Sequence, residues 1–245
     1  MKLSKSDSSI VLHKIFSNDS EYCNFEDVSS NIFQALLYEI KEKVNHNVLI
    51  TFDDGNISDY LIAYPELSKN SMKAFFFIIP SFIGSDKFLN WSMVREMSEN
   101  GMIIGSHSLS HKNLTELSEN ELDRELRVSK EIIEDKIGNQ VNNFSCPFGI
   151  YNNSVLEKAQ SLKYKSFFTS DHGIFKNNNF KKPRNSINAL TQKSQLPFIV
   201  KPTNSKIFMW RLEDILKSVT KRVIGQNMYL KIRDIYSENS KIINK

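Results

Sequence analysis

Two short stretches of the sequence bring together residue types that bind metal ions and move protons. The first is Thr51-Phe52-Asp53-Asp54-Gly55, in which two adjacent carboxylates follow an apolar run, and the second contains His107 and His111, four residues apart. A carboxylate with two imidazoles is a typical ligand set for a divalent ion. Asp-Gly is also a common turn pair, so the first stretch alone could equally be an ordinary turn. The two stretches together favour a site for one divalent metal ion, with Zn²⁺ as the first expectation.

Each of these stretches follows a predicted strand. Residues 48–51 and 102–106 are apolar runs next to turn residues, which indicates buried strands that carry the Asp pair and His107 at their carboxyl ends. Strands and helices alternate along most of the chain, as is typical of parallel β/α architecture, whose active-site face lies at the carboxyl ends of the strands. Further strands are expected at 9–16, 73–80, 143–146 and 164–169, and helices at 26–43, 59–67 as far as Pro65, 90–99, 118–137 and 153–162.

A third stretch, Phe144-Ser145-Cys146-Pro147-Phe148-Gly149, completes a set of motifs. Together with Thr51-Phe52-Asp53-Asp54-Gly55 and His107-Ser108-Leu109-Ser110-His111, it makes the chain resemble the polysaccharide deacetylase family, also known as the NodB homology domain or carbohydrate esterase family 4. The resemblance covers residues 48–190 and implies an α/β fold, an irregular (β/α)7 barrel. It also implies metal-dependent removal of an N- or O-acetyl group from a sugar.

The resemblance, together with the basic sequence beyond it, suggests how the chain is organised, and the resemblance also implies what the first two motifs do. Residues 1–245 are expected to form a single domain, with the motif-bearing core at about 9–200 and a basic helical C-terminal extension at about 206–238. Asp54, His107 and His111 would hold the metal ion. Asp53 would act as the general base that accepts a proton from the activated water.

The third motif is expected to contribute to substrate binding and catalysis. In the family, the backbone N–H of the residue that corresponds to Phe148 donates to the developing oxyanion, and the ring of Phe148 would form a wall of the acetyl pocket. Pro147, Phe148 and Gly149 are therefore the expected substrate-binding residues. Judged from the residues alone, they could also form an ordinary turn after a strand.

The chain departs from the family pattern at two places. Ser145 stands where many members have an arginine that orients the catalytic base, and Arg184 is the residue that could replace it. The late Leu-x-x-His motif, whose histidine acts as general acid, is not recognisable. His172 is the only histidine after the metal motif and is the candidate for this role, the alternative being a histidine on a surface loop. His13, at the end of the first predicted strand, is interpreted as structural.

Charge is unevenly distributed along the sequence. Residues 1–180 contain 18 basic and 24 acidic side chains, whereas residues 181–245 contain 14 basic and 4 acidic ones. A basic tail behind an acidic body suggests an anionic partner, although a solvated basic face would need none. Apolar residues between 210 and 223 recur with helical spacing. That face could pack against the barrel or form an interfacial helix on anionic lipid, whereas no nucleic-acid partner is expected.

The sequence also carries expectations about location and function. The apolar run at residues 10–12 is too short for a signal-peptide core, no run is long enough to span a membrane, and the chain has only two cysteines. We expect a cytoplasmic enzyme, with peripheral membrane association through the C-terminal region left open. Its expected substrate is an N-acetylated sugar, nucleotide- or lipid-linked, in glycan or polysaccharide biosynthesis. The alternatives are a catalytically silent carbohydrate-binding relative and an amidase that acts on a non-sugar amide.

Overall fold

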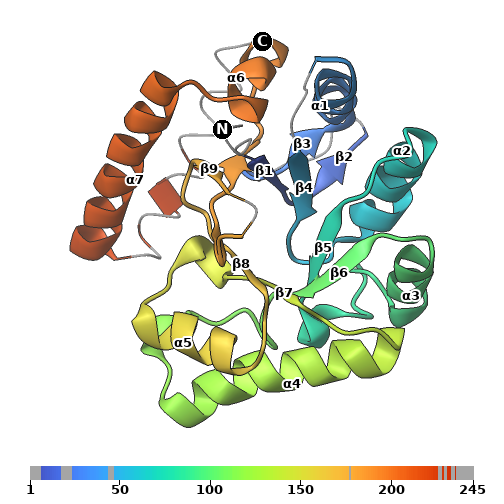
Figure 1. Ribbon diagram of the computed structural model, residues 1–245, viewed down its shortest axis with the longest axis vertical. Coiled ribbons are helices and arrows are strands. Elements are labelled where there is room, and N and C mark those ends of the chain that lie inside the picture. Colours follow the sequence, from blue (N-terminus) through green and yellow to red (C-terminus); the bar gives the residue numbers. More distant parts are fainter. Residues whose placement is uncertain are drawn as a thin grey trace, which may run out of the picture.

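The computed structural model describes residues 7–17, 24–43, 47–176, 178–225, 228, 231–232 and 235. Its main sheet curls into a nearly closed barrel with strand order β10-β8-β7-β6-β5-β4-β1-β11, and every neighbouring pair on this path is parallel (Figure 1). These strands are β1 (Asp7–Leu12), β4 (Val48–Phe52), β5 (Phe75–Ile78), β6 (Ile103–Ser106), β7 (Asn143–Ser145), β8 (Ser166–Phe168), β10 (Lys181–Lys182) and β11 (Asn185–Ser186). The parallel β/α architecture predicted from the alternation of strands and helices is confirmed.

Helices cover the outside of this sheet (Figure 1). They are α1 (Ser30–Lys43), α2 (Tyr64–Lys69), α3 (Trp91–Glu99), α4 (Glu119–Ile137), α5 (Asn153–Ser161), α6 (Leu196–Val200) and α7 (Asn204–Ile224). A π-helical turn, η1 (Asp59–Ala63), precedes α2, and 3₁₀ turns occur at η2 (Pro80–Phe82), η3 (Leu114–Glu116), η4 (Pro147–Gly149) and η5 (Lys193–Gln195). None of the described helices is long and apolar enough to cross a membrane.

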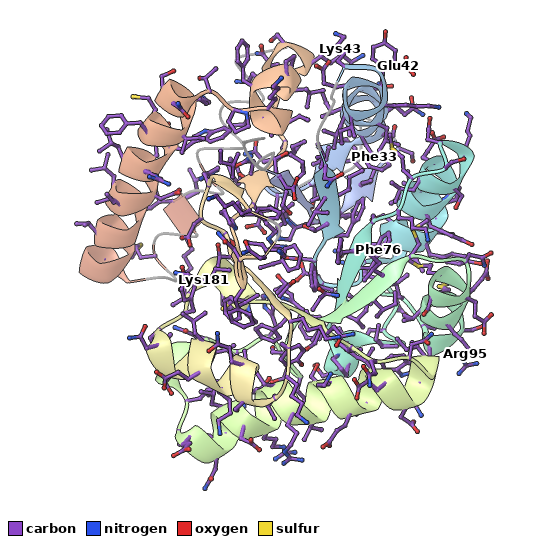
Figure 2. The ribbon with its side chains drawn as sticks, viewed as in Figure 1. Phe33, Glu42, Lys43, Phe76, Arg95 and Lys181 are labelled. Carbon is purple, nitrogen blue, oxygen red and sulfur yellow. The ribbon has the colours of Figure 1, made fainter. Side chains whose placement is uncertain are left out.

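Aromatic packing joins the helical layer to the sheet. The Phe33 ring on α1 meets the edge of the Phe52 ring on β4, with 5.8 Å between centroids, and Phe52 stacks on Phe76 of β5 at 4.8 Å. Figure 2 shows Phe33 and Phe76 within the molecule, whereas Glu42 and Arg95 lie at its edge. All three rings are fully buried, and each buries an area worth roughly 1.5–3 kcal/mol of hydrophobic stabilisation. This packing fixes β4, and therefore the Asp pair that follows it.

Two predicted elements near the N-terminus differ from the observed ones. The expected strand at 9–16 is divided, because β1 ends at Leu12 and β2 (Ile15–Phe16) pairs instead with β3 (Val28–Ser29). The expected helix at 26–43 consequently begins only at Ser30, where the Ser29 hydroxyl accepts a hydrogen bond from the N–H of Ile32. A short second sheet thus contains Ile15–Phe16, which were predicted as the end of a strand, and Val28–Ser29, which were predicted as the start of a helix.

The predicted helix that was expected to end near Pro65 continues to Lys69. Pro65 lies in the first turn of α2, which continues from η1 without a break, since the N–H of Tyr64 donates to the carbonyl of Asp59 across the junction. The N–H that Pro65 lacks therefore falls where the helix changes from π to α geometry. The preceding turn, η1, is π-helical, a geometry that occurs mainly as short insertions close to functional sites. The chain also returns at β9 (Ile174–Phe175), which pairs antiparallel with β1 and was not predicted.

Candidate active site

The Asp pair lies directly after β4, at the carboxyl end of the barrel strands. The N–H of Asp53 donates to the carbonyl of Leu12, which ties the pair to the end of the neighbouring strand β1. Asp54 and Gly55 both adopt positive φ, 76° and 74°, so the chain turns away sharply. A non-glycine residue with positive φ is strained, and such strain gathers at functional sites. The backbone therefore holds two adjacent carboxylates with different orientations.

The second motif forms a tight loop after β6. His107 donates its backbone N–H to the carbonyl of Ile78, and Ser108 and His111 have φ values of 63° and 58°. The hydroxyl of Ser108 accepts a hydrogen bond from the N–H of His111. These bonds turn both imidazoles toward the Asp pair, as predicted from their position after a strand.

Helix α4 supports this loop through two buried side chains that sequence reasoning did not single out. One carboxylate oxygen of Glu125 accepts the backbone N–H groups of Leu109 and Ser110 at 3.0 and 2.9 Å, and the other accepts the Ser110 hydroxyl at 2.6 Å. Ser129 donates to the carbonyl of Ser108. The polar type of Glu125 within an apolar helix face was the available signal, but only the fold shows which loop it holds.

Asp54, His107 and His111 form one group, the metal group, whose side chains could hold a metal ion. Their ligand atoms lie within 4.8 Å of one another, and Nε2 of each imidazole is 3.6–3.7 Å from Oδ1 of Asp54. These separations are too long for hydrogen bonds, but a tetrahedral ion with bonds of about 2.0–2.1 Å keeps its ligands only a little closer than this. Within the described ranges, this is the one group of three such side chains close enough to share an ion.

The surroundings of the two histidines favour metal binding. Nδ1 of His107 lies 2.8 Å from the Ser145 carbonyl, and a proton donated there leaves Nε2 free to face Asp54. Burial, together with the nearby His107, lowers the pKa of His111 to about 4. His111 is therefore neutral at pH 7 and able to bind a metal ion. The residues present fit a divalent cation in both chemistry and spacing.

Asp53 is held by Arg184 rather than by the metal group. The guanidinium forms two charged hydrogen bonds to the carboxylate, Nη1 to Oδ1 at 2.7 Å and Nη2 to Oδ2 at 2.8 Å. Arg184 also donates to the hydroxyls of Thr51 and Ser145 and to the carbonyl of Thr169. Its side chain is completely buried, so this network fixes the orientation of Asp53 within the barrel.

Ser145 has a larger part in the site than its short side chain suggested. Its hydroxyl donates to Oδ2 of Asp53 at 3.1 Å and accepts from Arg184, while its carbonyl accepts from His107. One residue thus links the carboxylate, the guanidinium and a metal-site histidine. Burial by itself would raise the pKa of Asp53, but Arg184 and His107 outweigh it and hold that pKa well below its usual range. Asp53 is therefore ionised throughout the neutral range.

The predicted substrate-binding residues Pro147, Phe148 and Gly149 form η4, which borders the metal group. The Phe148 ring lies 4.5 Å from that of His111 and remains 37% exposed. Phe148 has a φ of 57°, another strained residue at the site. A Cβ atom at Gly149, whose φ is 65°, would lie 2.5 Å from Cβ of Ser170, so the close packing of these two loops requires glycine. The exposed ring is in position to wall a small acyl group.

His172 lies in a different environment from the other predicted catalytic residues. Its Nδ1 is 2.8 Å from Oδ1 of Asp214 on α7, its ring stacks on Trp210 at 4.9 Å, and Nε2 is 3.4 Å from the Ser186 hydroxyl. This group borders a hollow of about 480 Å³ whose lining does not include the metal group. The role of His172 as general acid stays a prediction.

Two further titratable residues lie close enough to the Asp pair to interact electrostatically with it. Asp59 in η1 is fully buried, neither carboxylate oxygen has a hydrogen-bond partner among the described residues, and burial together with Asp54 and Asp53 raises its pKa well above normal. Burial would lower the pKa of His13, but Glu26 and the Asp pair raise it overall. From the sequence, Asp59 was only the first residue of the helix expected at 59–67, a position where an acidic side chain is ordinary.

The fold and site define a β/α-barrel protein with an Asp-His-His group, of the kind that binds a divalent ion, and a separately held carboxylate beside it. The family model described as polysaccharide deacetylase matches residues 41–167. The chain therefore belongs to the polysaccharide deacetylase family, and the resemblance expected from its motifs is confirmed.

Relatives and solved structures agree with this assignment. YxkH of Bacillus subtilis, named for the same family, is 34% identical over 138 residues, which cover 56% of this chain and 50% of YxkH. The poly-β-1,6-N-acetyl-D-glucosamine N-deacetylase of Staphylococcus aureus is 29% identical over 163 residues, which cover 60% of this chain and 56% of that protein. The chain thus spans about half the length of these relatives.

A solved structure shares the fold over most of the chain. The Streptococcus pyogenes deacetylase PplD, in complex with acetate, superposes with a TM-score of 0.75 at 24% sequence identity, covering 82% of this chain and all of that one. At this identity the likeness concerns the fold. The polysaccharide deacetylase type of barrel predicted from the motifs is confirmed.

Proposed function

We propose that this protein is a metal-dependent hydrolase that removes the acetyl group from an N-acetylated sugar. The observation that carries the proposal is the arrangement of Asp53 beside the Asp54-His107-His111 group, each held by its own buried hydrogen bonds. Family membership supports a deacetylase, and the Staphylococcus aureus relative is named for N-deacetylation of a glucosamine polymer. A catalytically silent binding protein would have no need of the buried Asp53–Arg184 pair.

Each residue near the metal group has a proposed chemical role. Asp54, His107 and His111 would hold the divalent ion, which when bound supplies an activated water and polarises the acyl oxygen. Asp53 accepts a proton from the attacking water, and Arg184 and Ser145 keep its carboxylate oriented for this transfer.

The η4 turn would act on the acyl group itself. The backbone N–H of Phe148 donates to the acyl oxygen as negative charge develops there, and the ring beside His111 confines the methyl group. Zn²⁺ is the proposed ion because a site of two imidazoles and one carboxylate leaves a position open for water, as catalytic zinc sites do.

We propose that the natural substrate is a carrier-linked, N-acetylated sugar in the cytoplasm, nucleotide- or lipid-linked. The strongly basic segment 181–245 supports an anionic carrier, because a neutral sugar would gain nothing from that charge. The direct experiment measures acetate release by the zinc-loaded protein from nucleotide-linked, lipid-linked and free N-acetyl sugars, with a non-sugar acetamide as comparison. Release from the acetamide alone would favour the amidase alternative, and no release from any substrate would reject the proposal.

The metal assignment predicts that His107→Ala or His111→Ala removes the ion. After zinc loading and dialysis, elemental analysis should find about one zinc per chain in the parent protein and a large loss in either variant, since two remaining ligands bind weakly. His172→Gln is the matched control, because this histidine lies outside the group and should retain the metal. Equal zinc content in all four proteins would show that the ligands are wrongly assigned.

The proposed role of His172 predicts a dependence on the leaving group. A general acid protonates the departing amine, so His172→Gln should slow N-deacetylation by about 10²-fold. An activated aryl acetate, whose leaving group needs no proton, should be hydrolysed at nearly the parental rate. If both substrates slow equally, or neither changes, His172 has a structural role through its contacts with Asp214 and Trp210.

A further inference from the structure

Helix α7 carries an unusually large exposed apolar surface. Among the described residues, fifteen large apolar side chains are exposed, and eleven of these lie between positions 198 and 235. On α7 itself they are Phe208, Met209, Leu212, Ile215, Leu216, Val219 and Ile224. Scattered exposed apolar residues are normal, but a continuous group of this size marks an interaction surface.

These side chains share one side of the helix. Their spacing of three and four residues places most of them on a single stripe, opposite the buried Ile207 and Trp210 that pack onto the rest of the protein. Leu216, at 66% exposure, lies near the centre of the stripe. Figure 1 shows α7 at the outer edge of the molecule, where one side faces away from the barrel. The apolar side is thus accessible to a partner from Phe208 to Val219, about three turns of the helix.

Charge distinguishes among the surfaces that could cover this stripe. Residues 204–224 contain five basic and two acidic side chains, and the segment 181–245 contains 14 basic and 4 acidic ones, in contrast to the acidic body. A second copy docked through α7 would bring two positively charged helices together. An anionic lipid surface instead complements both the apolar stripe and the positive charge. We propose that α7 docks this protein on an anionic phospholipid bilayer, with the stripe buried at the boundary between head groups and acyl chains.

The same segment comes close to Phe148, whose ring lies beside that of His111. A hollow of about 530 Å³ is lined on one side by Asn113, Glu116 and Phe148. On the other side it is lined by Ile224 at the end of α7 and by Met228 and Lys231 after it. Docking through α7 would therefore place this hollow, and Phe148 in its wall, near the bilayer surface. On the basis of the proposed function, this geometry selects a lipid-linked N-acetyl sugar as the substrate class, since its sugar is presented at that surface.

Vesicle flotation tests the docking step without any catalytic readout. The full chain should float with vesicles of phosphatidylcholine containing 30% phosphatidylglycerol, and much less with pure phosphatidylcholine or at high salt. Leu216→Glu should weaken this binding by at least about tenfold, because it removes one buried leucine and adds a negative charge. Leu61→Glu is the matched control, since Leu61 is 61% exposed but lies on η1, and it should float like the parent.

Three results would overturn the docking proposal. They are failure of the parent to float, equal binding of Leu216→Glu and Leu61→Glu, and a stable dimer in light scattering that Leu216→Glu alone dissociates. The dimer would identify a second copy as the occupant of the stripe. Circular dichroism of both variants should match the parent, because each residue is exposed in the folded protein.

Activity measurements separate the docking proposal from the proposed function. Leu216→Glu should lower acetate release from a lipid-linked N-acetyl sugar in vesicles by about tenfold and leave release from a soluble N-acetylated oligosaccharide unchanged. Asp53→Asn should lower both rates and leave flotation intact. Flotation with no activity on either substrate would reject the function and keep the docking. Equal effects of Leu216→Glu on both substrates would reject the link between docking and substrate.

Discussion

Asp53→Asn is expected to lower acetate release by about 10²–10⁴-fold while the protein retains its metal ion. The amide keeps the size of the side chain and one acceptor oxygen for Arg184, but it cannot accept a proton from the attacking water. Asp53 is not in the Asp54-His107-His111 group, so zinc content should match that of the parent. Steady-state acetate release and elemental analysis of the same sample give both quantities.

A surface substitution provides the control for this variant. Asp123→Asn removes one carboxylate from α4, where it pairs with Arg127 at the surface, and should leave turnover unchanged. Turnover of Asp53→Asn close to that of the parent, with metal bound, would mean that another group accepts the proton. Loss of zinc from Asp53→Asn would instead place this carboxylate among the metal ligands.

Arg184→Met should destabilise the protein and change its pH dependence. It leaves the buried Asp53 without its bidentate partner, and breaking a buried ion pair in this way costs about 3–5 kcal/mol of unfolding free energy. Without the guanidinium, burial raises the pKa of Asp53, so the acid limb of the kcat/KM profile should move to higher pH. Denaturant unfolding and a pH–rate profile measure the two effects.

The stability lost in Arg184→Met should depend on pH, because the pKa of Asp53 differs between the folded and unfolded protein. In the parent this pKa lies below its unfolded value, so the ion pair stabilises the protein fully above about pH 4 and less as the pH falls further. The stability difference between the parent and Arg184→Met should therefore be largest near neutral pH and shrink in acid. Arg184→Lys, which keeps the charge but loses the fork of two donors, should recover part of the stability.

Lys181→Met serves as the control for Arg184→Met. Lys181 is an exposed basic residue on β10, three positions earlier, and its Nζ lies 5.5 Å from the centre of the Tyr151 ring. Its loss should cost no more than about 0.5–1 kcal/mol of unfolding free energy and leave the pH profile unchanged. If Arg184→Met retained the parental acid limb, Arg184 would be a packing residue and another group would control the ionisation of Asp53. An unfolding free energy equal to that of the parent would contradict the buried pair itself.

The sequence by itself predicted the parallel β/α architecture, and it singled out Asp54, His107 and His111, which the fold brings together as a group that could hold a metal ion. Apolar runs such as 48–51 are local signals for buried strands, and parallel strands bring their carboxyl ends to one face whatever the length of the connections. Asp54, His107 and His111 follow two predicted strands, so they were expected at the same face of the sheet, and the structure adds that β5 alone separates those strands. The predicted boundaries of the strand at 9–16 and of the helix at 26–43 were wrong because β2 and β3 pair with each other. Local propensity does not predict which strands pair.

Only the tertiary structure decided which distant groups complete the site. Arg184 and Asp53 are 131 residues apart, and their pairing depends on β11 closing the barrel against β1. The anchoring of the His loop by Glu125 likewise depends on how α4 lies against the sheet. For α7, the periodicity showed an apolar face but could not show whether the barrel covers it. Whether a side chain is buried depends on residues that are far from it in the sequence. Here the fold buries Ile207 and Trp210 and leaves the opposite side of α7 exposed.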